Sequence, residues 1–140
     1  MNCELVFYLA KKTSMCERVL KKQLTSLNIN LVKTHFATGS IQLGNLLCDA
    51  FKECSLCFIV GGLEFSDQYG IKNVLSKALA NQHLDDMKKI ENPNNYLDGF
   101  IFRAGSQLIV VLPDEPDDIS AMLKSPLKEY LMDFSDHSKL

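Results

Sequence analysis

The sequence predicts an α/β protein, a three-layer α/β/α sandwich around a mixed, mostly parallel sheet with an antiparallel hairpin at one edge. Up to about residue 80, short apolar runs alternate three times with segments of helical periodicity. Three successive βα units with right-handed crossovers form a parallel sheet covered on both faces. Further along, two strand-like runs flank Gly105-Ser106, and a glycine at the first turn position is typical of a type II′ hairpin.

The first βα unit begins with the apolar run Leu5–Ala10, which predicts a strand buried on both faces. Ser14-Met15-Cys16-Glu17 then fits a capping box, in which Ser14 and Glu17 satisfy free amides at a helix start. The apolar face expected for this helix consists of Met15, Val19, Leu20, Leu24 and Leu27.

The next two units repeat the same pattern. Strands are predicted at Asn30–Ala37 and Ser55–Val60. Each is followed by a helical stripe, formed in the second unit by Leu43, Leu46, Leu47, Ala50 and Phe51 and in the third by Ile71, Val74, Leu75, Ala78 and Leu79.

The second half of the chain completes the sheet and one helical layer. The polar segment Asn81–Asn95 is interpreted as a helical continuation that leads into a loop. Gly99–Ala104 and Gln107–Leu112 are the hairpin strands. Asp114-Glu115-Pro116 opens a C-terminal helical region, which Ser125-Pro126 divides into two helices. We expect one domain over residues 1–134 and a C-terminal tail over 135–140.

Composition narrows the function classes. The chain has 140 residues, 46% of them hydrophobic and 23% charged, which excludes a disordered or low-complexity chain. The net charge of −2 argues against a generic electrostatic grip on nucleic acid. No apolar run approaches the roughly 20 residues of a membrane span, and the N-terminus lacks the order of an export signal. We therefore expect a cytoplasmic protein, no membrane partner, and five cysteines that remain thiols.

Two loops are the predicted places for a ligand, since ligands of open α/β sheets bind beyond the carboxyl ends of the strands. The loop after the first strand carries Lys11, Lys12 and Ser14, and the loop after the third strand starts with Gly61 and Gly62. Both lead into a helix N-terminus, which favours anions. The glycine pair alone is more typical of a simple turn than of a phosphate-binding loop.

Carboxylates near these loops have several interpretations. Asp67, with Ser66 beside it, could bind a metal, act as a base or cap the third helix. The acidic run that includes Asp114 could hold a divalent cation or complement a helix dipole. Cys54 and Cys57 form a CxxC on the N-terminal side of a strand, which predicts buried thiols and not a redox or zinc site.

Two segments together resemble the MoaB/Mog-type molybdopterin-binding domains, and in particular the CinA (competence/damage-inducible) branch. The segment GGLEFSD at residues 61–67 is similar to that family's Gly-Gly-Leu-Gly-Pro-Thr loop. The segment LPDEPDDISAML at residues 112–123 resembles its Leu-Pro-Gly-Val-Pro stretch, and Asp98-Gly99-Phe100 lies where the CinA branch has Pro-Gly-Phe. The resemblance implies an α/β/α domain that binds molybdopterin or an adenine nucleotide and forms homo-oligomers.

Departures from the family pattern predict an eroded site. Ala10-Lys11-Lys12 replaces an acidic Gly-Asp-Glu loop, and Glu64 and Phe65 replace a glycine and a proline. Only Asp67 could substitute for the family's paired aspartates. The features of the family motifs that this sequence retains are those that determine packing and backbone shape.

The main hypothesis is a CinA-like domain that binds a small anionic ligand, molybdopterin or an adenine nucleotide with Mg, with little turnover. The expected contacts are Lys11, Lys12, Ser14, Gly61, Gly62, Leu63, Ser66, Asp67, Pro113 and Asp114. Asp67 is the candidate catalytic residue. One alternative is a non-catalytic, oligomeric interaction or regulatory protein. Another is a metal-dependent nucleotide pyrophosphatase or nucleotidyltransferase, with Asp67, Asp114 and Asp118 around the metal.

Overall fold

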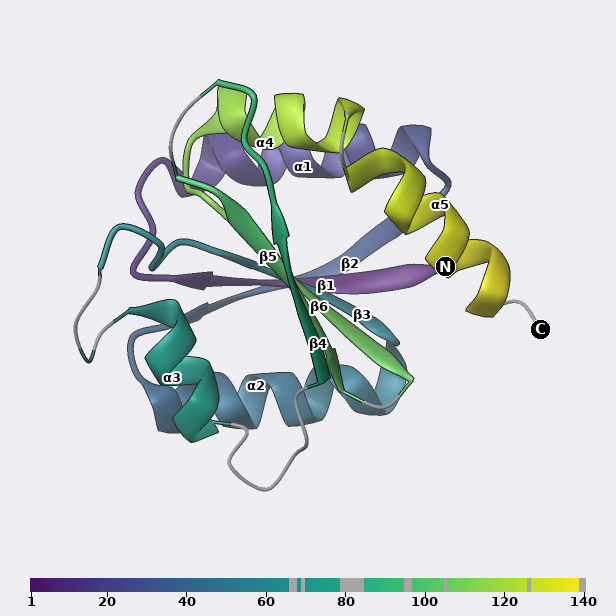
Figure 1. The fold of residues 1–140 in the computed structure, drawn as a ribbon. Helices are drawn as coiled ribbons and strands as arrows, with labels where there is room; N and C mark the ends of the chain where they lie inside the picture. The colour runs from purple at the N-terminus through teal and green to yellow at the C-terminus, as the bar shows by residue number, and fades with distance from the viewer. Residues whose placement is uncertain are drawn as a thin grey trace.

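In the computed structural model, one twisted sheet lies between two layers of helices (Figure 1). The structure describes residues 1–65, 68, 70–78, 85–94, 97–104, 106–125 and 127–138. Helices α1, α4 and α5 cover one face of the sheet, and α2 and α3 cover the other. The elements in chain order are β1 (Asn2–Tyr8), α1 (Thr13–Ser26), β2 (Asn30–Ala37), α2 (Ser40–Glu53), β3 (Leu56–Val60), α3 (Ile71–Ala78), β4 (Asp85–Ile90), β5 (Gly99–Ala104), β6 (Gln107–Leu112), α4 (Pro116–Lys124) and α5 (Leu127–Ser138).

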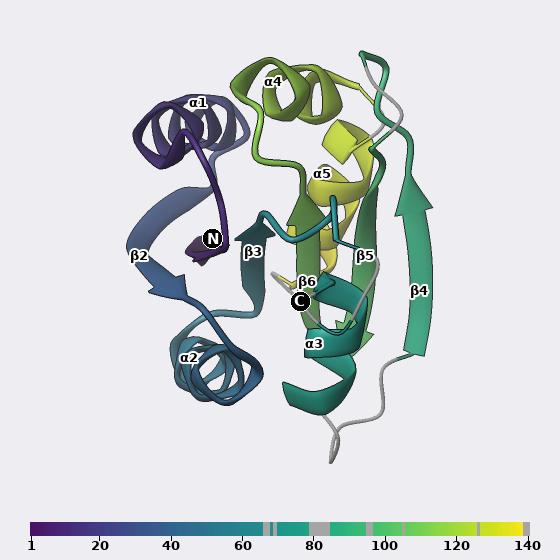
Figure 2. The same ribbon diagram turned by 90° about the vertical axis from the view of Figure 1, so that its left-hand side faces the viewer.

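The sheet is mixed and has the strand order β2-β1-β3-β6-β5-β4, with β2 and β4 at its two edges (Figure 2). Strands β2, β1, β3 and β6 are parallel, and β5 is antiparallel to both of its neighbours. The predicted sandwich is confirmed. The predicted hairpin of β5 and β6 is also present, with Ala104 opposite Gln107 at its closed end.

The strand β4 lies where the sequence analysis predicted a helical continuation, so that prediction is wrong for residues 85–90. The sequence does not reveal this strand, because it lies at the edge of the sheet and pairs with a neighbouring strand on one side only. Met87, Lys88 and Lys89 are exposed, and Ile90 is buried. Such a strand needs no apolar run, since backbone pairing with β5 holds it in place. Residues 79–84 and 95–96 of the same region lie outside the described residues.

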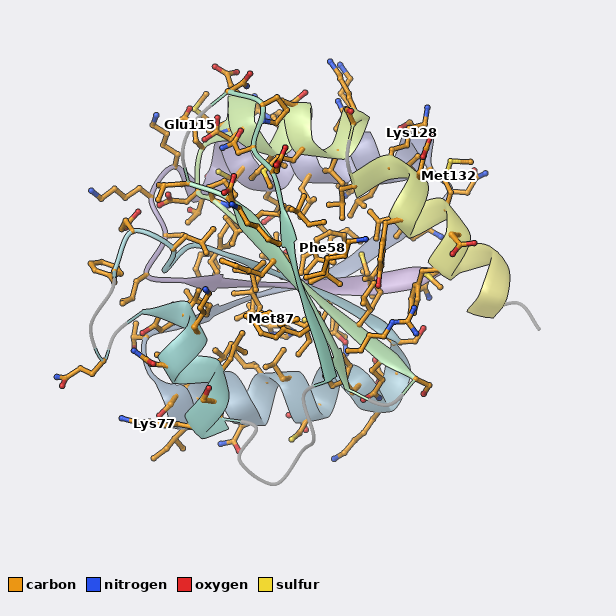
Figure 3. All side chains as sticks on the ribbon, viewed as in Figure 1. Phe58, Lys77, Met87, Glu115, Lys128 and Met132 are labelled. Atoms are coloured by element: carbon orange, nitrogen blue, oxygen red, sulfur yellow. The ribbon has the colours of Figure 1, made fainter. Side chains whose placement is uncertain are left out.

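The core has two halves, one on each face of the sheet. Successive side chains of β1 alternate between them, with Leu5 and Phe7 toward α1, α4 and α5 and with Val6 and Tyr8 toward α2 and α3. Both faces are therefore dry, which explains the continuous apolar runs of β1, β3 and β6. Phe58 of β3 is fully buried in the half of the core that faces α1, α4 and α5 (Figure 3).

The start of α1 differs from the prediction. Lys12 occupies the N-cap position in the left-handed conformation, with φ 54°, and no side chain caps the helix. Ser14 lies inside the first turn, so the predicted capping box does not form. The buried stripe consists of Cys16, Leu20 and Leu24, whereas Met15 is 56% exposed. The apolar cysteine takes the core position that the sequence analysis assigned to methionine.

The C-terminal helices begin and divide as predicted. Pro116 occupies the first turn of α4, and the helical region is interrupted between Lys124 and Leu127. Helix α5 continues to Ser138 and so takes in residues 135–138 of the expected tail. In the part of the chain that the structure describes, no helix is both long and apolar enough to cross a membrane.

All five cysteines are unpaired, and Cys48 is the exposed one. Burial raises the pKa of Cys3 and of Cys16 to about 12, and it raises the pKa of Cys54 and Cys57 as well. The predicted buried state of the CxxC thiols is confirmed.

We expect a thiol reagent at pH 8 to modify Cys48 rapidly in the folded protein and the other four cysteines only after unfolding, since the thiolate is the reactive species. Counting labelled thiols by mass spectrometry, with and without denaturant, checks this. The Cys48→Ser variant is the control and should show no fast labelling. Rapid modification of Cys54 or Cys57 in the native state would contradict the buried state of the pair.

Candidate functional site

Five connections lie at the edge of the sheet where the parallel strands end. They are residues 9–12 after β1, 38–39 after β2, 61–70 after β3, 91–98 before β5 and 113–115 after β6. Strands β1 and β3 are adjacent, but α1 and α3 leave them toward opposite faces of the sheet. This divergence is the switch point at which open α/β sheets hold ligands.

The glycine pair after β3 lies at this edge, as predicted, and packs closely on the end of β1. Gly61 and Gly62 have φ values of +112° and +79°. A Cβ atom at Gly61 would lie 2.2 Å from the carbonyl oxygen of Tyr8, and one at Gly62 would lie 2.6 Å from Cδ1 of the same tyrosine. The N–H of Gly61 donates to the carbonyl oxygen of Leu112 (3.1 Å). Close packing on Tyr8 and φ > 0 together account for both glycines.

The loop after β1 is tied to the turn after β6. The backbone N–H of Lys11 donates to Oδ2 of Asp114 (2.7 Å), and Nζ of Lys12 lies 2.6 Å from Oε2 of Glu115. The hydrogen bond and charge of Glu115 raise the pKa of Lys12. Glu115 lies at this loop edge, whereas Lys128 and Met132 lie on α5 at the far end of the same layer (Figure 3). The backbone N–H of Lys11 and the ammonium group of Lys12 thus bind carboxylates of the chain itself.

A cleft of about 620 Å³ opens on the other side of the glycine pair, between the β3–α3 connection and the start of β5. Its size is within the range of small-molecule sites, about 300–1,000 Å³. Gly62 and Leu63 form one wall, and the residues that complete the lining are Phe65, Gly70, Ile71, Lys72, Asn73, Lys89, Leu97, Asp98 and Phe100.

Charged and aromatic groups in this cleft are paired with one another. Nζ of Lys72 lies 4.0 Å from the ring centroid of Phe100, a cation–π contact. Nζ of Lys89 lies 3.1 Å from Oδ2 of Asp98. The backbone N–H of Asn92 donates to Oδ1 of Asp98 (3.0 Å) and is the main reason that the pKa of this carboxyl is lowered, with Lys89 contributing. The cleft therefore offers aromatic surface, two cations and one fixed carboxylate.

Solved structures share the fold of this chain over nearly its whole length. The CinA protein of Thermoplasma acidophilum, whose function is described as unknown, aligns with a TM-score of 0.75 and 16% identity over 93% of this chain and 97% of its own. The chain has a MoaB/Mog-like fold. MoaB of Thermus thermophilus, a molybdopterin biosynthesis enzyme, aligns with a TM-score of 0.72 and 14% identity over 96% of this chain and 94% of its own.

A third example of the MoaB/Mog-like fold is a molybdopterin biosynthesis protein from Mycobacterium abscessus, with a TM-score of 0.74 and 13% identity over 99% of this chain and 96% of its own. No protein-family model matches the sequence, and no curated protein matches it. The resemblance that two sequence segments indicated is confirmed for the fold.

The predicted site residues fall into separate groups in this MoaB/Mog-like fold. Lys11, Lys12 and Asp114 come together beside the buried Pro113, whereas Gly62 and Leu63 line the cleft. Ser14 is exposed in the first turn of α1, and Ser66 and Asp67 lie outside the described residues. Within the described ranges, no group of three His, Cys, Asp or Glu side chains is placed to hold a metal ion.

Glu64 adds a third carboxyl group near the contacts between the loop after β1 and the turn after β6. Partial burial and the nearby Asp114 carboxylate raise the pKa of Glu64, while Lys11 lowers it. With Asp114 and Glu115, three carboxylates surround two lysines here. A phosphate would meet no excess of positive charge at this position, in contrast to the cleft, where Lys72 and Lys89 face one carboxylate.

Sequence reasoning missed the charged side chains of the cleft, Lys72, Lys89 and Asp98. Lys89 belongs to the strand that was taken for a helix, and Lys72 follows the first residue of α3 and resembles any exposed helix lysine. Asp98 drew attention only through its place before Gly99-Phe100. A correct assignment of β4 as the strand beside β5 would have placed Lys89 and Asp98 at the same edge as the glycine pair.

Proposed function

We propose that the protein binds a small anionic ligand with a flat heterocyclic ring, a pterin such as molybdopterin or a nucleotide, in the cleft beside Gly62. The observation that carries this proposal is the cleft itself, which combines aromatic walls with cationic side chains beside the switch point of the sheet. The function proposed is binding, because the groups that the cleft presents are ones that hold and orient a ligand.

Each part of the ligand has a counterpart in the lining. Phe65 is 39% exposed, and Phe100 is partly buried, so both can offer ring surface to a heterocycle. Lys72 and Lys89 are exposed and can move toward an anionic group, since among the described residues Lys72 contacts the Phe100 ring and Lys89 pairs with Asp98. The start of α3 adds the positive end of a helix dipole on the same side.

The structural neighbours support the pterin class. MoaB of Thermus thermophilus and the Mycobacterium abscessus protein are both described as molybdopterin biosynthesis proteins. Their likeness to this chain lies in the fold, while the residues proposed to bind the ligand are this chain's own. The proposed contacts are Lys72, Lys89 and Phe100 in place of Lys11 and Lys12, because the Lys11 N–H and the Lys12 ammonium group already bind Asp114 and Glu115.

Isothermal titration with pterin-6-carboxylate, AMP and ATP, each with and without Mg²⁺, tests the proposal. We expect at least one of these compounds to bind with a Kd that Lys72→Ala weakens roughly tenfold, as for a charged hydrogen bond. Lys77→Ala is the matched control, since Lys77 is an exposed lysine of the same helix outside the cleft (Figure 3). Absence of binding by all three compounds, or an equal loss in both variants, would contradict the proposal.

A further inference from the structure

The carboxylate of Asp98 is held by two contacts within the cleft. Oδ1 accepts a hydrogen bond from the backbone N–H of Asn92, and Oδ2 forms an ion pair with Nζ of Lys89 at 3.1 Å. Its side chain is 22% exposed, and it lines the cleft. An exposed carboxylate on a free loop would adapt to any ligand, whereas this one is held at a fixed place.

The loop that carries Asp98 is itself fixed by Asn92, which is 7% exposed. Nδ2 of Asn92 donates to the carbonyl oxygen of Leu97 (3.1 Å), and Oδ1 of Asn92 accepts from the N–H of Asn94 (3.0 Å). The buried Asn92 side chain thus bonds to two backbone groups of this connection, one through its amide nitrogen and one through its amide oxygen. The turn presents the Asp98 carboxylate to the cleft in a preorganised position, which favours selective recognition.

The chemistry of the carboxylate restricts what can lie against it. An ionised carboxylate only accepts hydrogen bonds, and its two oxygens offer about four lone-pair positions. Among the described residues, the Asn92 N–H and Nζ of Lys89 occupy two of them. A phosphate would be repelled from it. The anionic part of a ligand therefore belongs near Lys72, and the part near Asp98 must carry N–H groups.

Heterocycles differ in the N–H groups that they can present to a carboxylate. Guanine and pterin both carry a 2-amino-4-oxopyrimidine edge, on which a ring N–H and an amino group point in parallel toward a pair of acceptors. Adenine offers an amino group beside a ring nitrogen, and that nitrogen is itself an acceptor, which a carboxylate repels. A site built to accept two N–H bonds rejects analogues that lack one of them more strongly than an apolar pocket rejects a change in size.

We infer that Asp98 selects ligands with a 2-amino-4-oxopyrimidine edge, a pterin or a guanine nucleotide, over adenine nucleotides in the cleft. The inference rests on the proposed function and adds the ring class and the residue that recognises it. The ring packs beside Phe65 and Phe100, its donor edge faces Asp98, and its anionic substituent faces Lys72. Adenine nucleotides, which the sequence analysis considered as ligands, then bind more weakly.

Titration of the full chain with GMP, IMP, AMP and pterin-6-carboxylate tests the inference. GMP, IMP and AMP share one phosphate tail, so differences among them isolate the ring edge. We expect GMP or the pterin to bind at least tenfold more tightly than AMP. IMP, which has the ring N–H but no 2-amino group, should bind more weakly than GMP. Comparison of GMP with the pterin shows which source of this edge fits better.

The Asp98→Asn variant should lose roughly 10–100-fold in affinity for the compounds with the 2-amino-4-oxo edge and little for AMP, because the amide replaces an acceptor by a donor. Glu91→Gln is the control, since it removes a carboxylate from the same connection at an exposed position outside the cleft lining. Thermal unfolding of both variants verifies that they fold. If Asp98→Asn does not fold, the GMP:AMP preference of the unmodified chain decides.

The outcomes separate the two proposals. Equal binding of GMP, IMP and AMP, or equal effects of Asp98→Asn on all of them, overturns the role of Asp98 and leaves the binding function intact. Lack of binding by every compound overturns both. A preference for the 2-amino-4-oxo compounds that Asp98→Asn removes supports both.

Discussion

Replacing Gly61 with alanine is expected to destabilise the protein by about 4 kcal/mol. Two costs combine. The φ of +112° is one that an L-residue rarely adopts, at about 1–3 kcal/mol. The new methyl group would also lie 2.2 Å from the Tyr8 carbonyl oxygen, a backbone atom of a central strand that cannot move aside. Overpacking of this kind adds about 1–3 kcal/mol.

Thermal and urea unfolding measure the effect, and a drop in Tm of roughly 10 °C or more is expected. Gly39→Ala is the matched control. Gly39 has an extended φ of −158°, and a Cβ atom there would meet nothing within 4 Å. Its replacement should cost less than about 1 kcal/mol, the size of a change at a helix N-cap. Similar losses for the two variants would show that close packing on Tyr8 is not what requires glycine at position 61.

The second large effect is expected at a polar pair within the α2 side of the sheet. Glu4 of β1 is 3% exposed, and its Oε1 shares a hydrogen bond of 2.7 Å with Nε2 of His35 on β2. Sγ of Cys54 lies 4.0 Å from the other oxygen. His35 is therefore a strand residue whose side chain has a polar partner.

Replacing His35 with leucine removes the main partner of a buried carboxyl group and should cost about 2–3 kcal/mol at pH 7. Removal of one partner of a fully buried pair costs about 3–5 kcal/mol, and water that reaches the His35 side chain, which is 29% exposed, reduces the penalty. The double variant Glu4→Leu/His35→Leu should recover much of the stability, because it leaves no unpaired polar group behind.

A surface pair on the same strand is the control for this cycle. Nζ of Lys33 lies 3.3 Å from Oε2 of Glu53, but both side chains are more than half exposed, at 54% and 62%. Lys33→Ala should therefore cost less than about 1 kcal/mol. Urea unfolding of the three variants gives the comparison. A loss for His35→Leu as small as that for Lys33→Ala would mean that Glu4 does not depend on its histidine.

The sheet could be predicted because its central strands are dry on both faces and its helices carry apolar stripes. The strand Leu56–Val60 is apolar throughout, and Gln107–Leu112 is apolar after its first residue. Such continuous runs are typical of strands that are buried on both faces. The edge strand β4 lacks this signal, since Lys88 and Lys89 are exposed and its stability comes from pairing with β5. Tertiary pairing of this kind leaves little trace in local composition.

The sequence predicted the edge of the sheet at which the cleft lies, but not the charged side chains that line the cleft. The glycine pair after β3 marks this edge, because the carboxyl ends of parallel strands lie together. Which lysines are available depends on long-range contacts. Lys12 is paired with Glu115, 103 residues away, and only the folded chain shows that Lys72 and Lys89 are the cations beside the cleft.

The tie between Lys11 and Asp114 has a consequence for competition at the switch point. Asp114 is tethered to the same molecule, so it competes with dissolved carboxylates or phosphates as though present at a millimolar or higher effective concentration. The Asp114 carboxylate therefore lowers the apparent affinity of the Lys11 N–H for any dissolved anion on the α1 side of the switch point.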